Sequence, residues 1–342
     1  MSEKREFLSK RALMIIGIIS VVILLLGIIL IFAGLNESFY ASQRAIRAVF
    51  KGITYLGEPV VFIMIAAIVY IGYNKKFAKN LALSLLITWY LNQFLKSIVQ
   101  DPRPATNVDV TEDYGMVEPS YGFPSGHTQN AVAFWGYFGD EFKDNTTYKL
   151  SNFTIPIVPV IISIIIFLVS ISRIIIGVHD VQDIVGGVLF GIAVLLIFMY
   201  LEPLVSEKFN NLTFTIKIIL TVTVSLSLFL VGTLLFPDAG MGLVANPPLY
   251  PDSGAFGQFG GVILGFGIGY LLEGEYVKYD PSSVPKKKLL INVIICIIIL
   301  LVVFVPFEYL LEIDSVFYRF ARYGIVSFVL AYIIPLICKK LN

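Results

Sequence analysis

Long apolar stretches separated by short polar connections run along this chain of 342 residues. Residues 12–36 carry no charged side chain, and as a helix they would extend about 37 Å at ~1.5 Å per residue, more than the ~30 Å hydrocarbon core of a bilayer. The pattern predicts about ten membrane-spanning helices, at roughly 12–34, 56–73, 81–99, 127–141, 154–172, 184–201, 214–236, 259–272, 289–307 and 323–338. The fourth and eighth stretches are short and polar or glycine-rich, so we expect other helices to enclose them.

Composition agrees with this pattern and excludes an ordinary soluble domain. Hydrophobic residues make up 57% of the chain and charged residues only 14%. We therefore predict an all-α fold, a polytopic membrane helix bundle of about ten transmembrane helices.

The basic residues before the first apolar stretch would suit a signal peptide, but the stretch is too long and lacks a clear small-residue cleavage site, so we expect an uncleaved first helix. Cys296 and Cys338 both lie in apolar stretches, which argues against a disulfide framework or a cysteine metal site.

The distribution of lysine and arginine predicts the orientation. With the N-terminus in the cytoplasm, most of the 25 basic residues fall in cytoplasmic connections, among them the cluster 286–288. Both termini are then cytoplasmic, in the cell membrane or, in a eukaryote, the endoplasmic reticulum. The long connections 100–123 and 237–257 lie on the opposite face.

The run GGVILGFGIG, residues 260–269, has small residues at helical spacing, which is typical of close helix packing.

Three polar islands lie at the outer ends of spans three to six, and the predicted topology places all three on one face. The first island, KSIVQDPRP, contains Lys96 and Arg103. Lys96 near the end of a span can simply snorkel, and Arg103 between two prolines can be a solvated loop charge. Arg173, in the third island, ends an apolar run on the face that the charge distribution disfavours. An arginine at that depth indicates a functional site.

The third island also contains His179 and Asp183, which are four residues apart. On a helix they would share a face, and the carboxylate would accept the imidazole N–H. That contact fixes the tautomer and leaves the other ring nitrogen as a base or nucleophile. A helix-stabilising pair is the usual explanation for an isolated match. Here the only other histidine, His127, lies in the second island, which favours catalysis.

The second island predicts a phosphate site at a helix start. Pro124, in the first turn, would be followed by Ser125 and Gly126, so that the free N–H groups and the positive dipole end face the outer mouth. Gly126 permits close approach, Ser125 adds a hydroxyl donor and His127 a proton donor. The remaining positive charge would come from three basic residues of the other islands, Lys96, Arg103 and Arg173.

Together, K-x6-RP (96–104), PSGH (124–127) and SR-x5-H-x3-D (172–183) resemble the three signature motifs of the type 2 phosphatidic acid phosphatase superfamily. That family includes glucose-6-phosphatase, sphingosine-1-phosphate phosphatases, undecaprenyl-diphosphate phosphatases and vanadium haloperoxidases. All three motifs occur in order and without a mismatch, which is far more specific than any one of them. Small members have six helices, and residues 214–338 add four spans in which no motif of known meaning is found.

The resemblance implies a role for each motif residue. His179 would attack phosphorus and become a phosphohistidine, Asp183 would orient it, and His127 would protonate the leaving group and later activate water. The phosphate oxygens would be held by five residues: Lys96, Arg103, Ser125, Gly126 and Arg173. No metal and no cofactor are implied.

We therefore predict an integral-membrane, metal-independent phosphatase of a lipid phosphate or diphosphate, such as phosphatidate, polyprenyl diphosphate or sphingoid phosphate. Its active site would lie on the extracytoplasmic or lumenal face. The predicted segments are a first helix with an outer amphipathic segment (1–55), a catalytic core (56–201) that belongs to a six-helix phosphatase unit, and additional helices (202–342).

Three alternatives stay open at the level of the sequence. The substrate could be a soluble phosphate ester such as a sugar phosphate, or the enzyme could transfer phosphate between lipids. An anion transporter would explain the buried arginines but gives no reason for the spacing of His179 and Asp183. Nothing in the sequence indicates a nucleic-acid partner, and the oligomeric state is not predicted.

Overall fold

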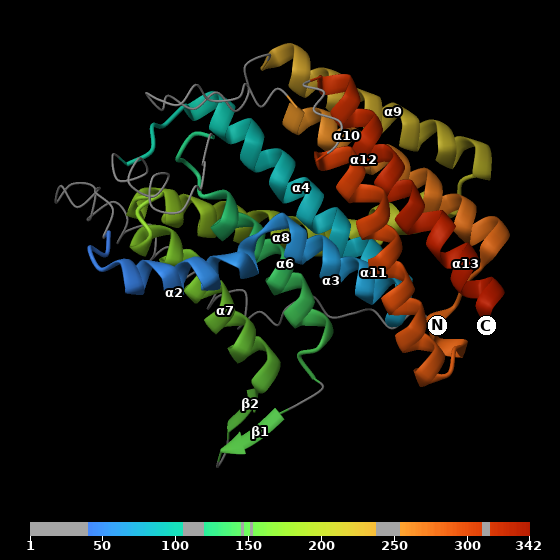
Figure 1. Ribbon diagram of the computed structural model, residues 1–342, viewed down its shortest axis with the longest axis horizontal. Coiled ribbons are helices and arrows are strands. Elements are labelled where there is room, and N and C mark those ends of the chain that lie inside the picture. The colour runs from blue at the N-terminus through green and yellow to red at the C-terminus, as the bar shows by residue number, and fades with distance from the viewer. Residues whose placement is uncertain (1–39, 105–119, 145–146, 151–152, 237–253, 310–314) are drawn as a thin grey trace. The chain divides into compact units, whose positions relative to one another are not determined.

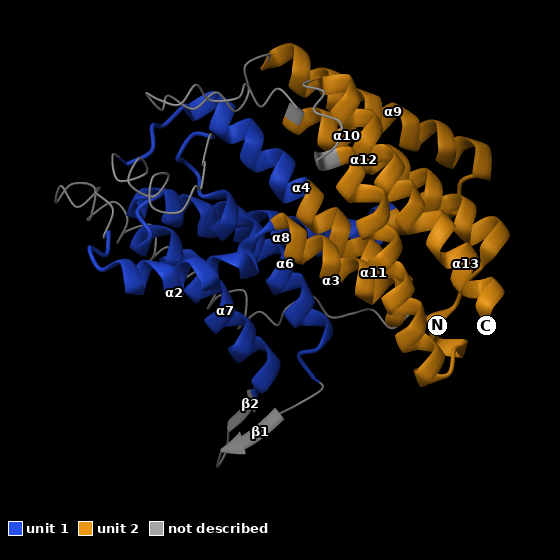
Figure 2. Cartoon of the chain, viewed as in Figure 1, with its two compact units in different colours: residues 1–58, 87–205, 242–249 blue, residues 59–86, 206–241, 250–342 orange. Residues whose placement is uncertain are grey.

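The computed structural model describes residues 40–104, 120–144, 147–150, 153–236, 254–309 and 315–342 (Figure 1). The predicted first span, 12–34, and most of the two long outer connections lie outside these residues. The chain divides into two compact units (Figure 2), formed by residues 1–58, 87–205 and 242–249 and by residues 59–86, 206–241 and 250–342. Helices α4 (Lys75–Val99) and α8 (Val181–Asn210) each contribute to both units.

The first unit carries the three polar islands. Besides its parts of α4 and α8, its described elements are α2 (Arg44–Thr54), the 3-10 turn η1 (Tyr55–Gly57), α6 (Gly126–Glu141), β1 (Thr147–Leu150), β2 (Phe153–Pro156) and α7 (Ile157–Ile175). The two strands form an antiparallel hairpin in which Thr147 pairs with Pro156 and Leu150 with Phe153. Hydropathy did not predict this hairpin, which replaces the expected start of the fifth span.

Helix α6 is enclosed by its neighbours, as expected for the fourth stretch. Its Phe134 is fully buried, and the helix packs against α7. Glycines of α8 let that helix approach α6 closely, because a Cβ added at Gly187 would lie 2.8 Å from the carbonyl oxygen of Ser125 and one at Gly191 would lie 2.7 Å from Cβ of Val132. The start of α6 is therefore held against the start of α8.

The second unit contains the remaining helices. These are α3 (Pro59–Gly72), α9 (Phe214–Leu235), α10 (Gly254–Leu272), the π-helical turn η2 (Glu273–Val277), the 3-10 turn η3 (Pro281–Ser283), α11 (Lys286–Tyr309), α12 (Val316–Phe328), the π-helical turn η4 (Val329–Ile333) and α13 (Ile334–Leu341). Helix α10 packs against α9 and α12. A Cβ added at Gly261 would lie 2.2 Å from the carbonyl oxygen of Phe320, and one at Gly265 would lie 1.9 Å from that of Gly324. The prediction of close helix packing at residues 260–269 is confirmed.

Polar contacts explain why residues 59–86 cluster with the C-terminal helices, although the predicted segments place them in the catalytic core. The buried carboxylate of Glu273 accepts hydrogen bonds from Lys75 Nζ at 2.7 Å and from the backbone N–H of Tyr279 at 2.7 Å. The hydroxyl of Tyr70 donates to the carbonyl oxygen of Ala331 at 3.0 Å. These bonds join α3 and the first turn of α4 to the π-helical turns η2 and η4, which follow α10 and α12.

Within the described residues, six helical stretches are long and apolar enough to cross a membrane. They are Ile157–Ile175, Val181–Asn210, Phe214–Leu235, Ala255–Val277, Lys286–Phe307 and Val316–Leu341, and each corresponds to a predicted span. Three further predicted spans form α3, α4 and α6; α3 and α6 have only 14 and 16 residues, and α4 is lysine-rich. The predicted all-α membrane bundle is confirmed.

Candidate active site

The connection between α7 and α8 brings His179 and Asp183 together. Helix α7 ends where the backbone N–H groups of Val178 and His179 both donate to the carbonyl oxygen of Arg173, each at 3.2 Å. Gly177 turns the chain there with a φ of 87°, a conformation that favours glycine. The imidazole Nδ1 of His179 then lies 2.7 Å from Oδ2 of Asp183, and both side chains are buried.

His179 precedes α8, so the expectation that it shares a helical face with Asp183 is wrong, although the contact itself is present. Asp180 caps the helix: its Oδ1 accepts from the N–H of Asp183 at 3.2 Å, and Oδ2 of Asp183 accepts from the N–H of Asp180 at 3.4 Å. This is the reciprocal geometry of a capping box. The cap holds the Asp183 carboxylate in the position from which it contacts the imidazole.

Arg103 lies at the other nitrogen of the His179 ring. With Nδ1–H donated to Asp183, Nε2 carries the lone pair, and Nη1 of Arg103 lies 3.1 Å from it. The guanidinium is held by the carbonyl oxygens of Val178 at 2.8 Å and Ser120 at 2.6 Å and by the Ser120 hydroxyl at 3.1 Å. The first and third islands therefore meet at Nε2 of His179.

Lys96 joins the same cluster from the last turn of α4. Its buried ammonium donates to the carbonyl oxygens of Tyr121 and Gly122. The N–H of Gly122 donates to the carbonyl oxygen of Asp101 at 2.8 Å, and a Cβ added at Gly122 would lie 3.0 Å from Oδ2 of Asp183. Lys96 thus orders the chain that approaches the second island.

Arg173 reaches the site from the last turn of α7. Its side chain is fully buried, and Nη1 donates to the hydroxyl of Thr54 at 2.9 Å. A guanidinium buried to this degree needs polar or anionic partners. Arg173 therefore joins α2 to the cluster.

The second island forms the start of α6, but Pro124 lies outside the first turn in which it was expected. Ser125 is the N-cap, and its hydroxyl accepts from the N–H of Thr128 at 3.5 Å; Pro124 therefore precedes the cap and is not in the first turn, because a serine oxygen satisfies the helix start better. The N–H of Ser125 donates to the carbonyl oxygen of Asp183 at 3.0 Å. Gly126 is the first helical residue, and a Cβ there would lie 3.1 Å from Oδ1 of Asn92.

His127 has a partner that the sequence did not indicate. Its Nε2 lies 3.1 Å from Oε1 of Glu58, the residue after η1. Glu58 belongs to none of the three motifs and lies far from His127 in the sequence. Only the packing of η1 against α6 brings the two together.

The basic residues of the three islands act on the pKa of His179. Burial lowers the pKa of His179 well below its usual range, and the positive charges of four groups lower it further, Arg103 first, then Lys96, Arg173 and His127. The imidazole is therefore neutral at physiological pH. A neutral ring among cations is suited to attack an anion.

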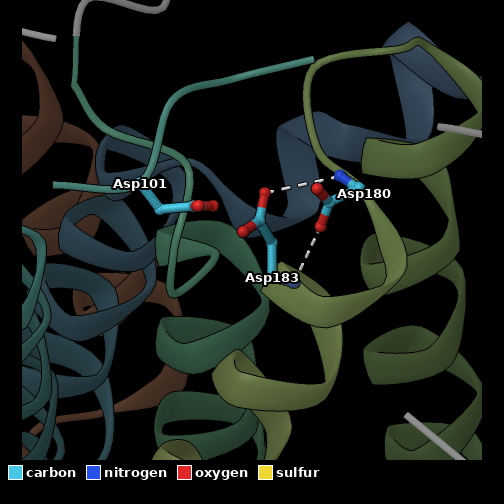
Figure 3. A group of neighbouring side chains, drawn as sticks. All are labelled: Asp101, Asp180 and Asp183. Atoms are coloured by element: carbon cyan, nitrogen blue, oxygen red, sulfur yellow. Dashed lines mark hydrogen bonds between the residues drawn. The ribbon is translucent and has the colours of Figure 1, made fainter. Parts of the chain in front are cut away.

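Asp183 belongs to a group of three neighbouring carboxylates (Figure 3). Asp101, Asp180 and Asp183 each offer an oxygen within 4.8 Å of the others. Burial raises the pKa of Asp101 and raises that of Asp180 to about 6. Such a group has the composition of a cation site, but protein donors already serve it: the amide of Gln182 lies 3.3 Å from both Asp101 and Asp180. The absence of a metal therefore stays a prediction.

Comparison with known proteins gives two family matches. Residues 77–207 match the PAP2 superfamily, and residues 257–342 match the transmembrane extension of PAP2 superfamily phosphatases. The second match falls in the region where the sequence showed no motif.

Three curated proteins are similar to the chain. Phosphatidylglycerophosphatase B of Bacillus subtilis is 31% identical over 46% of this chain and 74% of its own length. Lipid phosphate phosphatase delta of Arabidopsis thaliana is 25% identical over 43% of the chain, and human sphingosine-1-phosphate phosphatase 2 is 26% identical over 42%. The chain covers only 36% and 35% of these last two proteins. A crystal structure of the B. subtilis PAP2-type phosphatidylglycerolphosphate phosphatase matches 55% of the chain with 24% identity and a TM-score of 0.38.

Proposed function

Because the chain belongs to the PAP2 superfamily, we propose that it is an integral-membrane phosphatase that hydrolyses a lipid phosphate or diphosphate through a phosphohistidine on His179. The observation that carries this proposal is the arrangement of that ring, with Asp183 at 2.7 Å from Nδ1 and Arg103 at 3.1 Å from Nε2. A carboxylate at one nitrogen and a guanidinium at the other prepare the lone pair of Nε2 for an anionic electrophile.

In the first step, the Nε2 lone pair forms a bond to phosphorus and the bond from phosphorus to the leaving oxygen breaks. Asp183 stabilises the positive charge that develops on the imidazole. Arg103, which contacts Nε2 in the structure, turns its N–H groups to the phosphate oxygens when substrate arrives. Lys96, Arg173, the Ser125 hydroxyl and the helix start at Gly126 supply the remaining positive charge and hydrogen-bond donors.

His127 serves both steps. It gives a proton to the leaving oxygen, and the neutral imidazole then takes a proton from the water that attacks the phosphohistidine. The bond between phosphorus and Nε2 of His179 breaks, and the electron pair returns to that nitrogen. Inorganic phosphate is released and both histidines regain their starting states.

The membrane setting of the site residues, which lie at the ends of α4, α6, α7 and α8, supports a lipid substrate. The similar proteins are named for phosphatidylglycerophosphate, lipid phosphate and sphingosine-1-phosphate. We extend this substrate class to the present chain, together with phosphatidate and polyprenyl diphosphate.

A substrate panel tests the proposal. The purified protein in detergent should release inorganic phosphate from at least one of phosphatidate, phosphatidylglycerophosphate, polyprenyl diphosphate and sphingoid phosphate, and His179→Ala should release none. Release from a sugar phosphate alone would contradict a lipid substrate. Loss of substrate without free phosphate, and with a new phosphorylated lipid, would indicate transfer in place of hydrolysis.

Metal independence has its own test at the carboxylate group of Figure 3. The basic residues and the α6 start do the work that a metal does in other phosphatases, so activity should persist in excess EDTA. Asp101→Asn removes one of the three carboxylates but none of the proposed catalytic groups, and it should leave the response to EDTA unchanged. Activity that disappears in EDTA and returns with added Mg²⁺ would show that the carboxylates hold a cation.

A further inference from the structure

Glu58 and His127 form a second histidine–carboxylate pair in the first unit. Their side chains approach to 3.1 Å, with the histidine 14% and the glutamate 28% exposed. The pair is thus more open than His179 and Asp183, which are almost fully buried. An opening of this kind suits a residue that exchanges protons with substrate and water.

The position of Glu58 is fixed by the turn that precedes it. The indole N–H of Trp135, on α6, donates to the carbonyl oxygen of Leu56 at 3.0 Å. Gly57 lets the turn approach α7 and α6, because a Cβ there would lie 2.6 Å from Cγ1 of Val169 and 3.2 Å from Cδ2 of His127. Contacts with α6 and α7 therefore hold the turn beside the imidazole. The contact between Glu58 and His127 does not depend on two flexible surface side chains.

We infer that Glu58 is a positioning residue for His127. The inference rests on the function proposed above, in which His127 is the acid and base of the reaction. The carboxylate orients the ring, holds the proton on Nε2 and favours the protonated imidazole that must donate to the leaving oxygen. The site then contains two pairs of the same kind, one for the nucleophile and one for the acid.

The proton movements balance with this assignment. The protonated His127 keeps its Nε2–H on Glu58 and gives the Nδ1 proton to the leaving oxygen, which takes the electron pair of the broken P–O bond. Nδ1 then takes a proton from the attacking water as the new P–O bond forms. Glu58 stays ionised throughout and never leaves Nε2.

The leaving group distinguishes this role from a structural one. A general acid is needed in proportion to the basicity of the departing oxygen, and it is typically worth about 10²–10⁴-fold. Glu58→Gln keeps the size of the side chain and removes its charge. It should therefore slow phosphoenzyme formation from an alkyl lipid phosphate by about tenfold or more and leave that from nitrophenyl phosphate nearly unchanged, because nitrophenolate departs without a proton.

The experiment measures the first turnover of both esters in wild type, Glu58→Gln, His127→Ala and the double variant, with the exposed Glu275→Gln as a matched control. We expect Glu58→Gln to lose the alkyl ester selectively, the double variant to be no slower than His127→Ala, and the control to match wild type. Equal losses for both esters in Glu58→Gln, or additive losses in the double variant, would overturn the role of Glu58. If His127→Ala itself shows no dependence on the leaving group, the proposed function fails at the acid, independently of Glu58.

A measurement that needs no variant of Glu58 covers the case in which Glu58→Gln fails to fold. The chain has only two histidines, so ¹⁵N-histidine labelling gives two imidazoles, and His179→Ala assigns the remaining one to His127. The neutral His127 ring should carry its proton on Nε2, facing Glu58. A proton on Nδ1 with Nε2 unprotonated would contradict the inference.

Discussion

Burial and the neighbouring positive charges both lower the pKa of His179, and both therefore keep its ring neutral. Burial has the opposite effect on Asp101 and Asp180 and raises the pKa of each, because a buried carboxylate loses solvation when it ionises. The site therefore places a neutral nucleophile among cations next to acids that ionise reluctantly. The cations therefore attract a phosphate group to the nucleophile more strongly than the carboxyl groups repel it.

Asp180 provides a prediction on pH and stability. Its pKa is raised from 3.8 to about 6, mainly by burial. A carboxyl group shifted upward by folding stabilises the protein fully below its unfolded pKa, and that contribution is lost as the pH rises through the folded value. Asparagine keeps the N-cap and never ionises, so Asp180→Asn should be more stable than wild type at about pH 7.5 and show a smaller advantage at about pH 4.5. Thermal unfolding in detergent at the two pH values measures the difference.

The exposed Asp280 is the control for this pH effect. Hydrogen bonds from the Ser282 side chain and backbone lower its pKa, so Asp280→Asn should lose stability at about pH 7.5 relative to wild type. A difference between wild type and Asp180→Asn that is equal at both pH values would show that ionisation of Asp180 does not oppose folding.

The sequence predicted that the three islands come together but not the local geometry of their residues. The contact between His179 and Asp183 followed from spacing, yet the residues lie across a helix cap, because Asp180 caps α8 one residue after the histidine. Pro124 was expected in the first turn of α6, but Ser125 is the N-cap and Pro124 precedes it. Glu58 could not be predicted, since no local pattern links it to His127.

At the level of elements, glycines decide how closely two neighbouring helices can pack. The backbones of α10 and α12 approach so closely that no Cβ fits at Gly261 or Gly265. Small residues at helical spacing permit such packing in membranes. The spacing predicted the contact, but the partner helix, α12, could be identified only in the structure, because glycine spacing does not specify what lies opposite.

Gly265→Ala tests this packing. The added Cβ would lie 1.9 Å from the carbonyl oxygen of Gly324, a backbone atom that cannot turn away. Overpacking of this kind typically costs about 1–3 kcal/mol, so the variant should unfold at lower temperature in detergent. Gly274→Ala is the matched control because nothing lies within 4 Å of its added Cβ, and it should match wild type. Equal thermal stability of all three proteins would mean that α10 and α12 are not closely packed.

Within the part of the chain that the structure describes, hydropathy located the helices but not the irregular elements between and within them. The π-helical turns Glu273–Val277 and Val329–Ile333 lie inside stretches that read as continuous helix. The hairpin Thr147–Leu150 and Phe153–Pro156 was read as a loop and the start of a span. Backbone hydrogen bonds define each of these elements. An average of side-chain hydrophobicity does not detect such bonds.

For the whole molecule, the orientation in the membrane remains a prediction from the basic residues. Ser42 precedes α2 on the predicted outer face, Ser282 lies beside the cytoplasmic lysine cluster, and both are exposed. The native Cys296 and Cys338 are free and buried, which limits background reaction. An impermeant thiol reagent should label Ser42→Cys in intact cells and Ser282→Cys only after permeabilisation. Labelling of Ser282→Cys alone in intact cells would reverse the orientation and place the active site in the cytoplasm.

The central claim is that His179 receives the phosphoryl group and His127 handles the protons, and trapping the intermediate tests it most directly. After a first turnover with labelled nitrophenyl phosphate, His127→Ala should accumulate acid-labile, base-stable phosphate on His179, because the phenolate leaves unaided and water is no longer activated for the second step. His179→Ala should carry no label. Label in the His179→Ala variant, or equal loss of the aryl ester reaction in both variants from the first turnover, would contradict the assignment of the two histidines.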